Sequence, residues 1–188
     1  LGYISDGENA GSVYVNCTAD DRYLFVSDEH AQAITVIDLG KARGSGFQPD
    51  AIVGKIPVGR APIALTFSPD ERHLYTTSQV APKSYGWPAA CKPEGQDPAT
   101  ATPTNPAGAL IVVDVERAKV DPPSSIVARV PAGCSPVRLA ISPAGDVAYV
   151  TARNSNAVLA FDPWSSPAES SWSGTPTASR AGATTGNR

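Results

Sequence analysis

Residues 56–77 read Ile-Pro-Val-Gly-Arg-Ala-Pro-Ile-Ala-Leu-Thr-Phe-Ser-Pro-Asp-Glu-Arg-His-Leu-Tyr-Thr-Thr. Residues 130–151 repeat them as Val-Pro-Ala-Gly-Cys-Ser-Pro-Val-Arg-Leu-Ala-Ile-Ser-Pro-Ala-Gly-Asp-Val-Ala-Tyr-Val-Thr. The Ser-Pro pairs of the two copies lie at the same interval as their first residues, and a weaker copy runs from Val13 to Asp38. Repetition at this scale indicates a solenoid or a propeller, in which each unit packs on the next.

The spacing inside the copies supports a single repeated unit. The step from an aromatic residue to a closing aspartate has the same length in the first copy, Phe25 to Asp38, and in the last, Tyr149 to Asp162. In the middle copy, from Tyr75 to Asp114, the step is much longer. We interpret the extra length of the middle copy as an insertion.

Alternating apolar and polar residues predict short strands in every copy. In the first copy these strands cover residues 12–17, 23–27, 34–39 and 51–58. Turns separate them, and in the turn at Ser68-Pro69 the proline presets φ while the serine can bond back to the backbone. Residues 41–50 are expected to form a loop. Because no segment carries an apolar stripe of helical period, we expect no long helix and predict an all-β fold.

Charge and composition narrow the possible partners. The 188 residues carry a formal net charge of −3 without a cluster of Lys and Arg, so neither nucleic acid nor an anionic membrane is expected. No apolar run approaches the roughly 18 residues that a membrane-spanning helix needs. The sequence has no initiator Met and no signal peptide before Leu1, so we expect a mature or truncated chain.

The sequence shows no pattern for a metal or a cofactor, and we predict neither. Its two histidines, His30 and His73, form no Ser-His-Asp or metal-ligand arrangement, and His73 is expected to be structural. The three cysteines fit no zinc spacing. The three closing aspartates belong to different units and are expected to bond the backbone at strand ends rather than to meet at an ion.

Two segments depart from the repeat. The insertion, residues 80–107, is rich in Pro, Ala and Thr and poor in aliphatic residues, so we predict a long surface loop. Residues 163–188 are a low-complexity tail, which from Ser165 onward consists largely of Ser, Thr, Gly and Ala with Trp172 as its single Trp, and we predict that this tail is disordered.

The repeat resembles that of the YVTN family of β-propeller proteins. That unit reads I-P-V-G-x-x-P-x-x-[LI]-x-x-S-P-D-G-x-x-[LV]-Y-V-T-N, followed by x-x-x-N-x-V-x-V-[IF]-D. The middle copy matches it at Ile56–Gly59, Pro62, Leu65, Ser68–Asp70, Leu74–Thr76 and Asp114. The last copy matches it at Pro131, Gly133, Pro136, Leu139, Ser142-Pro143, Tyr149–Thr151, Asn156, Val158 and Phe161-Asp162. Ser78 and Ala152 replace the final Asn, and Thr18-Ala19 replaces Ser-Pro.

The resemblance implies four-stranded blades around a central channel. Residues 1–162 would form a partial propeller with blades at about 12–58, 62–131 and 136–162. Such rings usually hold seven blades, so this chain cannot close a ring alone. We expect either missing blades or self-association to cover the open faces of its sheets.

The resemblance also implies that two kinds of loop share one face of the ring. Cys91 lies in a loop between second and third strands, and Cys134 lies in a loop that leads into an innermost strand, one blade further on. A disulfide between them is then feasible and would imply an oxidising compartment. Two free thiols are the alternative. Cys17, on an inner strand, is expected to be a small buried residue.

The same face would present the candidate ligand residues. Asp28, Glu29 and His30 lie in one loop, and Arg153 and Asn154 lie in the equivalent loop of the last blade. Binding residues collect on such loops of a rigid scaffold. Ordinary solvated loops are the competing interpretation.

We favour a non-catalytic binding or scaffold module that takes an unknown protein or small-molecule ligand. We expect it to be extracytoplasmic, meaning secreted, periplasmic or at the cell surface, while a cytoplasmic location stays open. The first alternative is a lactonase-type hydrolase that resembles 6-phosphogluconolactonases, with Asp28, His30 and Arg153 nearest to catalytic roles. The second is a structural repeat of a surface layer or cell wall.

Overall fold

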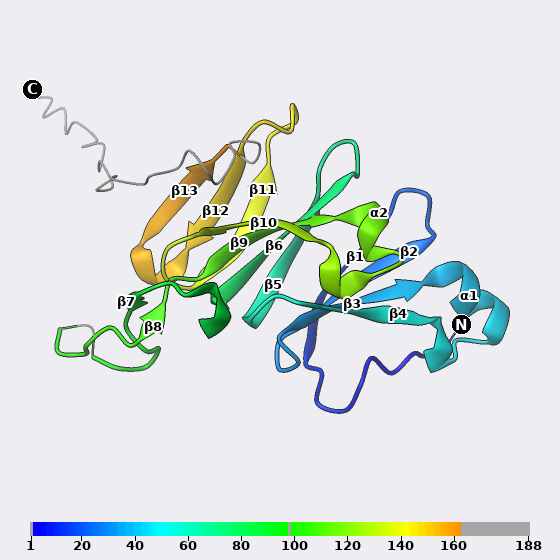
Figure 1. Ribbon diagram of the computed structural model, residues 1–188, viewed down its shortest axis with the longest axis horizontal. Coiled ribbons are helices and arrows are strands. Elements are labelled where there is room, and N and C mark those ends of the chain that lie inside the picture. The colour runs from blue at the N-terminus through cyan, green and yellow to red at the C-terminus, as the bar shows by residue number, and fades with distance from the viewer. Residues whose placement is uncertain (1, 98, 163–188) are drawn as a thin grey trace, which may run out of the picture.

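The computed structural model describes residues 2–97 and 99–162, whose three larger antiparallel sheets lie side by side (Figure 1). Sheet I contains β1 (Ser12–Cys17), β2 (Tyr23–Asp28), β3 (Ala33–Asp38) and β4 (Ile52–Pro57). Sheet II contains β5 (Arg60–Phe67), β6 (His73–Val80), β9 (Ala109–Asp114) and β10 (Ile126–Pro131). Sheet III contains β11 (Pro136–Ile141), β12 (Ala148–Ala152) and β13 (Ala157–Phe161). The described chain is an all-β partial propeller, as the repeat predicts.

Each sheet opens on the same irregularity. The pairing of the first strand with the second shifts between Ser12 and Tyr14, between Pro62 and Leu65, and between Pro136 and Arg138. These β-bulges contain Val13, Ile63 and Val137, and each lies the same number of positions before the turn residue of its copy, Thr18, Ser68 or Ser142. The repeat is therefore visible in the backbone as well as in the sequence.

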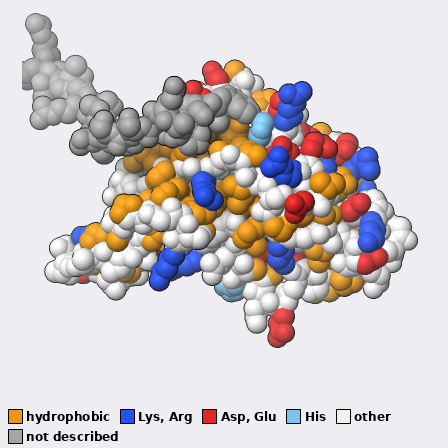
Figure 2. All heavy atoms as spheres, viewed as in Figure 1, with side chains coloured by type: hydrophobic (Ala, Val, Ile, Leu, Met, Phe, Trp, Pro, Cys, Tyr) orange, Lys and Arg blue, Asp and Glu red, His pale blue; other side chains and the backbone are white. Residues whose placement is uncertain are grey.

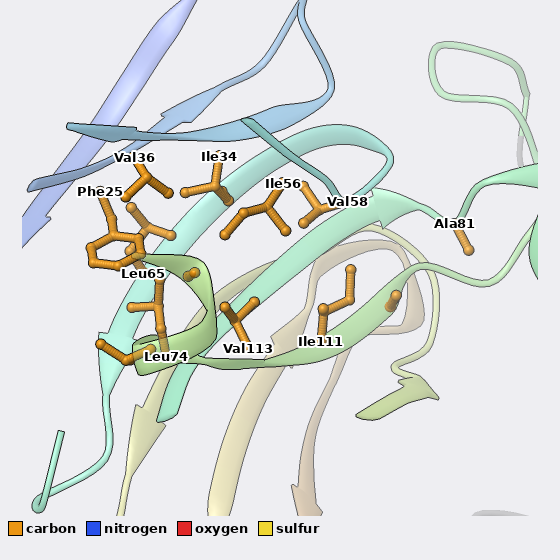
Figure 3. Close-up of a cluster of buried hydrophobic side chains, with 13 residues drawn as sticks. Phe25, Ile34, Val36, Ile56, Val58, Leu65, Leu74, Ala81, Ile111 and Val113 are labelled. Atoms are coloured by element: carbon orange, nitrogen blue, oxygen red, sulfur yellow. The ribbon is translucent and has the colours of Figure 1, made fainter. Parts of the chain in front are cut away.

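The largest core cluster fills the space between sheets I and II (Figure 3). It joins Phe25, Ile34 and Val36 of sheet I to Leu65, Leu74, Ile111 and Val113 of sheet II. A second cluster joins Tyr75, Leu110 and Val112 of sheet II to Ala148 and Val150 of sheet III. Successive strand residues point to opposite faces, so sheet II buries one apolar face against each neighbour.

The turn between first and second strands shows why the Ser-Pro position recurs. The hydroxyl of Ser68 accepts the backbone N–H of His73 at 3.1 Å, and the hydroxyl of Ser142 accepts that of Val147 at 3.0 Å. Thr18 does the same for Tyr23 at 3.1 Å, although its turn lacks the proline. A side-chain oxygen at this position thus satisfies the first N–H of the returning strand.

The predicted loop at residues 41–50 is partly wrong, because α1 (Leu39–Ser45) and η1 (Pro49–Ala51) occupy the connection between β3 and β4. In sheet II the same connection holds α2 (Val115–Ala118) and η3 (Pro122–Ser124). The closing aspartates start both helices: Asp38 accepts the N–H of Lys41 at 2.8 Å, and Asp114 accepts that of Arg117 at 2.9 Å. Helices of this length are too short to leave a recognisable apolar stripe.

The insertion is more ordered than a plain surface loop. It contains η2 (Lys83–Tyr85) and a small hairpin of β7 (Ala89–Cys91) and β8 (Asn105–Pro106). Tyr85 and Trp87 pack against the core cluster of Figure 3, and the Arg129 guanidinium lies 4.2 Å from the centre of the Tyr85 ring. Two aromatic residues thus supply the apolar contact that a count of aliphatic residues misses.

The expectation that Cys17 is buried is wrong: its side chain is exposed, because among the described residues no sheet covers the outer face of β1. The tail at residues 163–188 lies outside the described residues. Within residues 2–97 and 99–162 there is no helix of the length and apolarity that crossing a bilayer would require. On the surface shown in Figure 2, acidic and basic side chains are interspersed, in keeping with the small net charge.

Candidate functional site

A cavity of about 410 Å³ opens where the loops of sheets I and II meet the insertion. Four segments supply its walls: the β2–β3 loop, the turn from β4 into β5, the end of β6 with the insertion, and the turn into β11. The lining residues are Glu29, His30, Gln32, Arg60, Ala61, Gln79, Val80, Cys91, Lys92, Glu94, Asn105 and Ser135. This is the face on which the sequence places its candidate ligand loops.

The β2–β3 loop holds Glu29 and His30 through backbone contacts. The N–H of Glu29 donates to the carbonyl of Gly11 at 2.8 Å, and that of His30 donates to Ala10 at 3.1 Å. A Cβ at Gly11 would lie only 2.9 Å from the His30 ring, and its φ of +70° is one that side chains disfavour. Gly11 therefore lets the N-terminal segment pass close under His30 and fixes the loop.

Three lining residues have left-handed backbones, and one of them, Gln32 with φ of 56°, lies in the β2–β3 loop. Ala61 has φ of 48° and Ser135 has φ of 51°, at equivalent positions just before the bulges of β5 and β11. A non-glycine residue in this region costs about 1–3 kcal/mol, and such strain often gathers at binding sites. The turns into the innermost strands are thus held in one shape by the surrounding sheet.

The disulfide fixes the far wall of the cavity. Cys91, on β7, is joined to Cys134, just before β11, with their Cα atoms 5.5 Å apart. The structure thus contains the pair for which the sequence left bridged and free forms open. An ion pair between Glu94 of the insertion and Arg153 ties the same wall a second time. The insertion is anchored to sheet III at two points.

Arg153 and Asn154, the candidate residues of the last blade, contact residues of this wall from the side away from the cavity. Arg153 opens η4 (Arg153–Ser155) and contacts the lining residue Glu94, while the Asn154 amide donates to the lining residue Ser135 at 2.9 Å. Neither residue lines the cavity itself. Both position residues that do.

Asp28 lies apart from the cavity. Its side chain is fully buried, and one oxygen accepts from Lys55 at 2.8 Å and from Thr35. Burial raises the pKa of Asp28, the hydrogen bonds from Lys55 and Thr35 oppose the rise, and a hydrogen bond with Asp6 adds to it. Because Asp28 is enclosed by its own sheet and the N-terminal segment, it has no access to a ligand in the cavity.

The charges in the cavity are mixed. Glu94 is paired with Arg153, whereas among the described residues no ion pair engages the guanidinium of Arg60. Within the described chain, no carboxylate hydrogen-bonds to His30. The cavity also contains three side-chain amides that add donors and acceptors, those of Gln32, Gln79 and Asn105. This arrangement can hold a polar ligand but shows no assembled general-base pair.

The sequence singled out Glu29 and His30 but missed most of the lining. Arg60 follows Gly59 in the turn that leads into an innermost strand. The propeller resemblance places such turns on the same face as the loops between second and third strands, so it could also have indicated Arg60. The lining residues of the insertion, Lys92, Glu94 and Asn105, could not be placed because its path was unknown.

A second cavity, of about 330 Å³, lies at the opposite end of sheets I and II. It is lined by turn residues that bond one another: the Glu71 carboxylate accepts the N–H of Ala19, and Asp20 accepts from the hydroxyl of Thr18. Across the described residues, no group of three or more acidic, His or Cys side chains is placed to hold a metal ion.

Comparison with known proteins places the fold but no family. No protein-family model matches the chain. No curated protein matches it either. Among solved structures, a proposed 6-phosphogluconolactonase of Bacteroides fragilis matches with a TM-score of 0.55 and 13% identity over 82% of this chain and 35% of that one. Hydrazine synthase of Kuenenia stuttgartiensis matches with a TM-score of 0.55 and 23% identity over 86% and 36%.

A proposed 6-phosphogluconolactonase of Bacteroides uniformis gives a TM-score of 0.53 and 14% identity over 83% and 37% of the two chains. The chain therefore spans about a third of the length of the solved structures that it matches. At these identities the likeness shows a propeller-type fold and nothing finer.

Proposed function

We propose that this chain is a non-catalytic binding module of the YVTN β-propeller type, which takes a small polar ligand into the cavity beside Glu29, His30 and Arg60. The observation that carries the proposal is the cavity itself. Side chains from four separate segments converge on it, and its outer wall is covalently fixed. A concave site of a few hundred Å³ with several converging polar groups is the usual form of a small-ligand site.

The lining favours a hydroxylated ligand that carries negative charge. Arg60 offers a planar fork of N–H donors suited to a carboxylate or a phosphate. Gln32, Gln79 and Asn105 can each donate to and accept from hydroxyl groups. Glu29 supplies a further acceptor at the rim.

A lactone hydrolase is the second candidate. It is favoured by the names of two matched structures, both proposed 6-phosphogluconolactonases, and by the presence of His30 and Glu29 in the cavity. In that function Arg60 would hold an anionic lactone while His30 activated water.

Calorimetric titration with gluconate and 6-phosphogluconate, beside a hydrolysis assay on the matching lactones, separates the two functions. The binding module predicts saturable binding that Arg60→Gln weakens about tenfold or more, by loss of a charged hydrogen bond. Arg72→Gln, at the opposite end of the sheets, is the matched control. Turnover that His30→Asn abolishes would replace the module with the hydrolase. The absence of both binding and turnover would contradict both functions.

The disulfide supports an extracytoplasmic location, since such bonds persist in oxidising compartments. Fractionation of the producing cell, with thiol labelling before lysis, tests this. Recovery of the chain from the reducing cytoplasm with Cys91 labelled would contradict it.

A further inference from the structure

The sheets of this chain are joined by one repeated contact. The hydroxyl of Ser27 in β2 points to the carbonyl of Ile63 at 3.4 Å, and the hydroxyl of Thr77 in β6 points to that of Val137 at 3.3 Å. In both cases the acceptor is the bulge residue that opens the next sheet. The contact therefore has a hydroxyl half on a second strand and a bulge half on the following first strand.

The outer face of sheet III carries the hydroxyl half with no sheet against it among the described residues. Thr151 is the equivalent of Thr77 in the next unit, since each lies two positions after the tyrosine of its copy. Tyr149 is 46% exposed, whereas its equivalents Phe25 and Tyr75 are fully buried. Val158 is 67% exposed, whereas its equivalents Ile34 and Leu110 are buried.

The outer face of β1 carries the other half. Val13 is its bulge residue, equivalent to Ile63 and Val137. Val15 is 52% exposed, although its equivalent in sheet II, Leu65, is only 1% exposed. A small cluster made by α1, Phe47 and Ile4 covers β2, β3 and β4 of sheet I and leaves β1 open.

We propose that a second copy of this chain binds head to tail, with β1 of each copy packed on β11 and β12 of the other. The hydroxyl of Thr151, which lies 3.4 Å from the carbonyl of Arg138 in its own sheet, then also points to the carbonyl of Val13, as the hydroxyl of Ser27 lies 3.4 Å from the carbonyls of both Tyr14 and Ile63. The described residues of two copies supply two identical contacts and six of these stacked sheets. Closed propellers hold about four to eight sheets, so this number lies within the range that closes. A two-fold ring also leaves no end open to further growth.

Sedimentation velocity of the full chain over a concentration series tests the contact. The expected species is a dimer, and Val15→Lys or Val158→Lys should each weaken it about a hundredfold, because either change buries an unpaired charge. Val127→Lys on β10 is the matched control, since Val127 is 46% exposed but lies at neither end of the stack. Circular dichroism of each variant verifies that the sheets are intact.

Mixing the two variants tests the direction of the contact. A Val15→Lys chain and a Val158→Lys chain retain one sound contact between them, so the mixture should form a heterodimer that neither variant forms alone. A monomer at every concentration would overturn the proposal. A dimer indifferent to Val15→Lys would show sheet III pairing with itself, and assemblies that grow with concentration would refute the closed ring.

Discussion

The carboxylate of Glu71 in sheet II accepts the backbone N–H of Ala19 in sheet I with both oxygens, at 2.9 and 3.0 Å. At the next junction Pro69 takes the place of Ala19 and has no N–H, and Gly145 stands where Glu71 does. A Cβ on Gly145 would lie 3.3 Å from the Pro69 ring. The same junction is thus closed by a charged hydrogen bond in one place and by close packing in the other.

Replacing Glu71 with Gln should lower the free energy of unfolding by about 0.5–1.5 kcal/mol, because a charged acceptor becomes a neutral one on a solvent-exposed N–H. Urea denaturation measures the difference. Glu8→Gln is the control, since Glu8 is exposed and distant from the junction. An equal loss in both variants would contradict a specific role for Glu71.

Tyr75→Phe should leave stability unchanged or raise it by about 1 kcal/mol. The Tyr75 hydroxyl is buried without a hydrogen-bond partner among the described residues, and a buried unsatisfied polar group costs roughly 1–3 kcal/mol. Sheet I already has Phe25 at the equivalent position. Thermal unfolding tests this, with Tyr149→Phe on the exposed face as the control. A marked loss of stability would reveal a partner for the hydroxyl.

Removing the disulfide should destabilise the chain by up to about 4 kcal/mol, the entropy of closing a loop of this length in the unfolded state. The bond spans 43 residues. Denaturation of the Cys91→Ser, Cys134→Ser double variant measures this loss. Cys17→Ser is the control and should change little, because Cys17 is free and exposed. Thiol titration of the wild-type protein under denaturing conditions should find one free thiol before reduction and three after it.

Asp28→Asn should change how stability depends on pH. Burial raises the pKa of Asp28 above its ordinary value of 3.8, so the folded chain holds this proton more tightly than the unfolded chain does. The contribution of Asp28 to the free energy of unfolding is therefore largest below pH 3.8, and it is lost as the pH rises through the raised pKa of the folded chain.

The stability of the wild type relative to Asp28→Asn should decline across that window and then level off. Urea denaturation at a series of pH values measures the difference, and carboxylates that do not interact with Asp28 cancel because both proteins contain them. Asp6 does not cancel, because Asp28 helps to lower the pKa of Asp6. A relative stability that increased with pH would reverse the sign and show that Lys55 and Thr35 outweigh burial.

The repeat made the sheets predictable, and their stacking could be inferred from Phe25, Tyr75 and Tyr149 at equivalent positions. The face shared by Cys91 and Cys134 was implied by the resemblance to a propeller. Burial could not be read from the repeat. Asp28 looked like a loop residue beside His30, yet it is the last residue of β2 and its side chain is buried against Thr35 and Lys55 of the same sheet. Cys17 occupies an inner strand, but no sheet in the described part of the chain lies over it.

For a similar reason, only part of the cavity lining could be predicted from the sequence. Glu29 and His30 lie in a short loop whose position the strands fix, whereas Lys92 and Glu94 depend on the path of a long insertion. That path is set by two aromatic contacts and a covalent bond, none of which follows the period of the repeat. Contacts that obey the repeat were predictable, and contacts peculiar to one unit were not.

Cys91 belongs to the second unit and Cys134 to the turn that opens the third. In a chain of similar units, a unit can dock against the wrong copy during folding. In the folded chain this disulfide links those two units as neighbours. Oxidation therefore fixes the correct order of these two units covalently. A chain that had stacked in the wrong order would be recognisable by free thiols at Cys91 and Cys134.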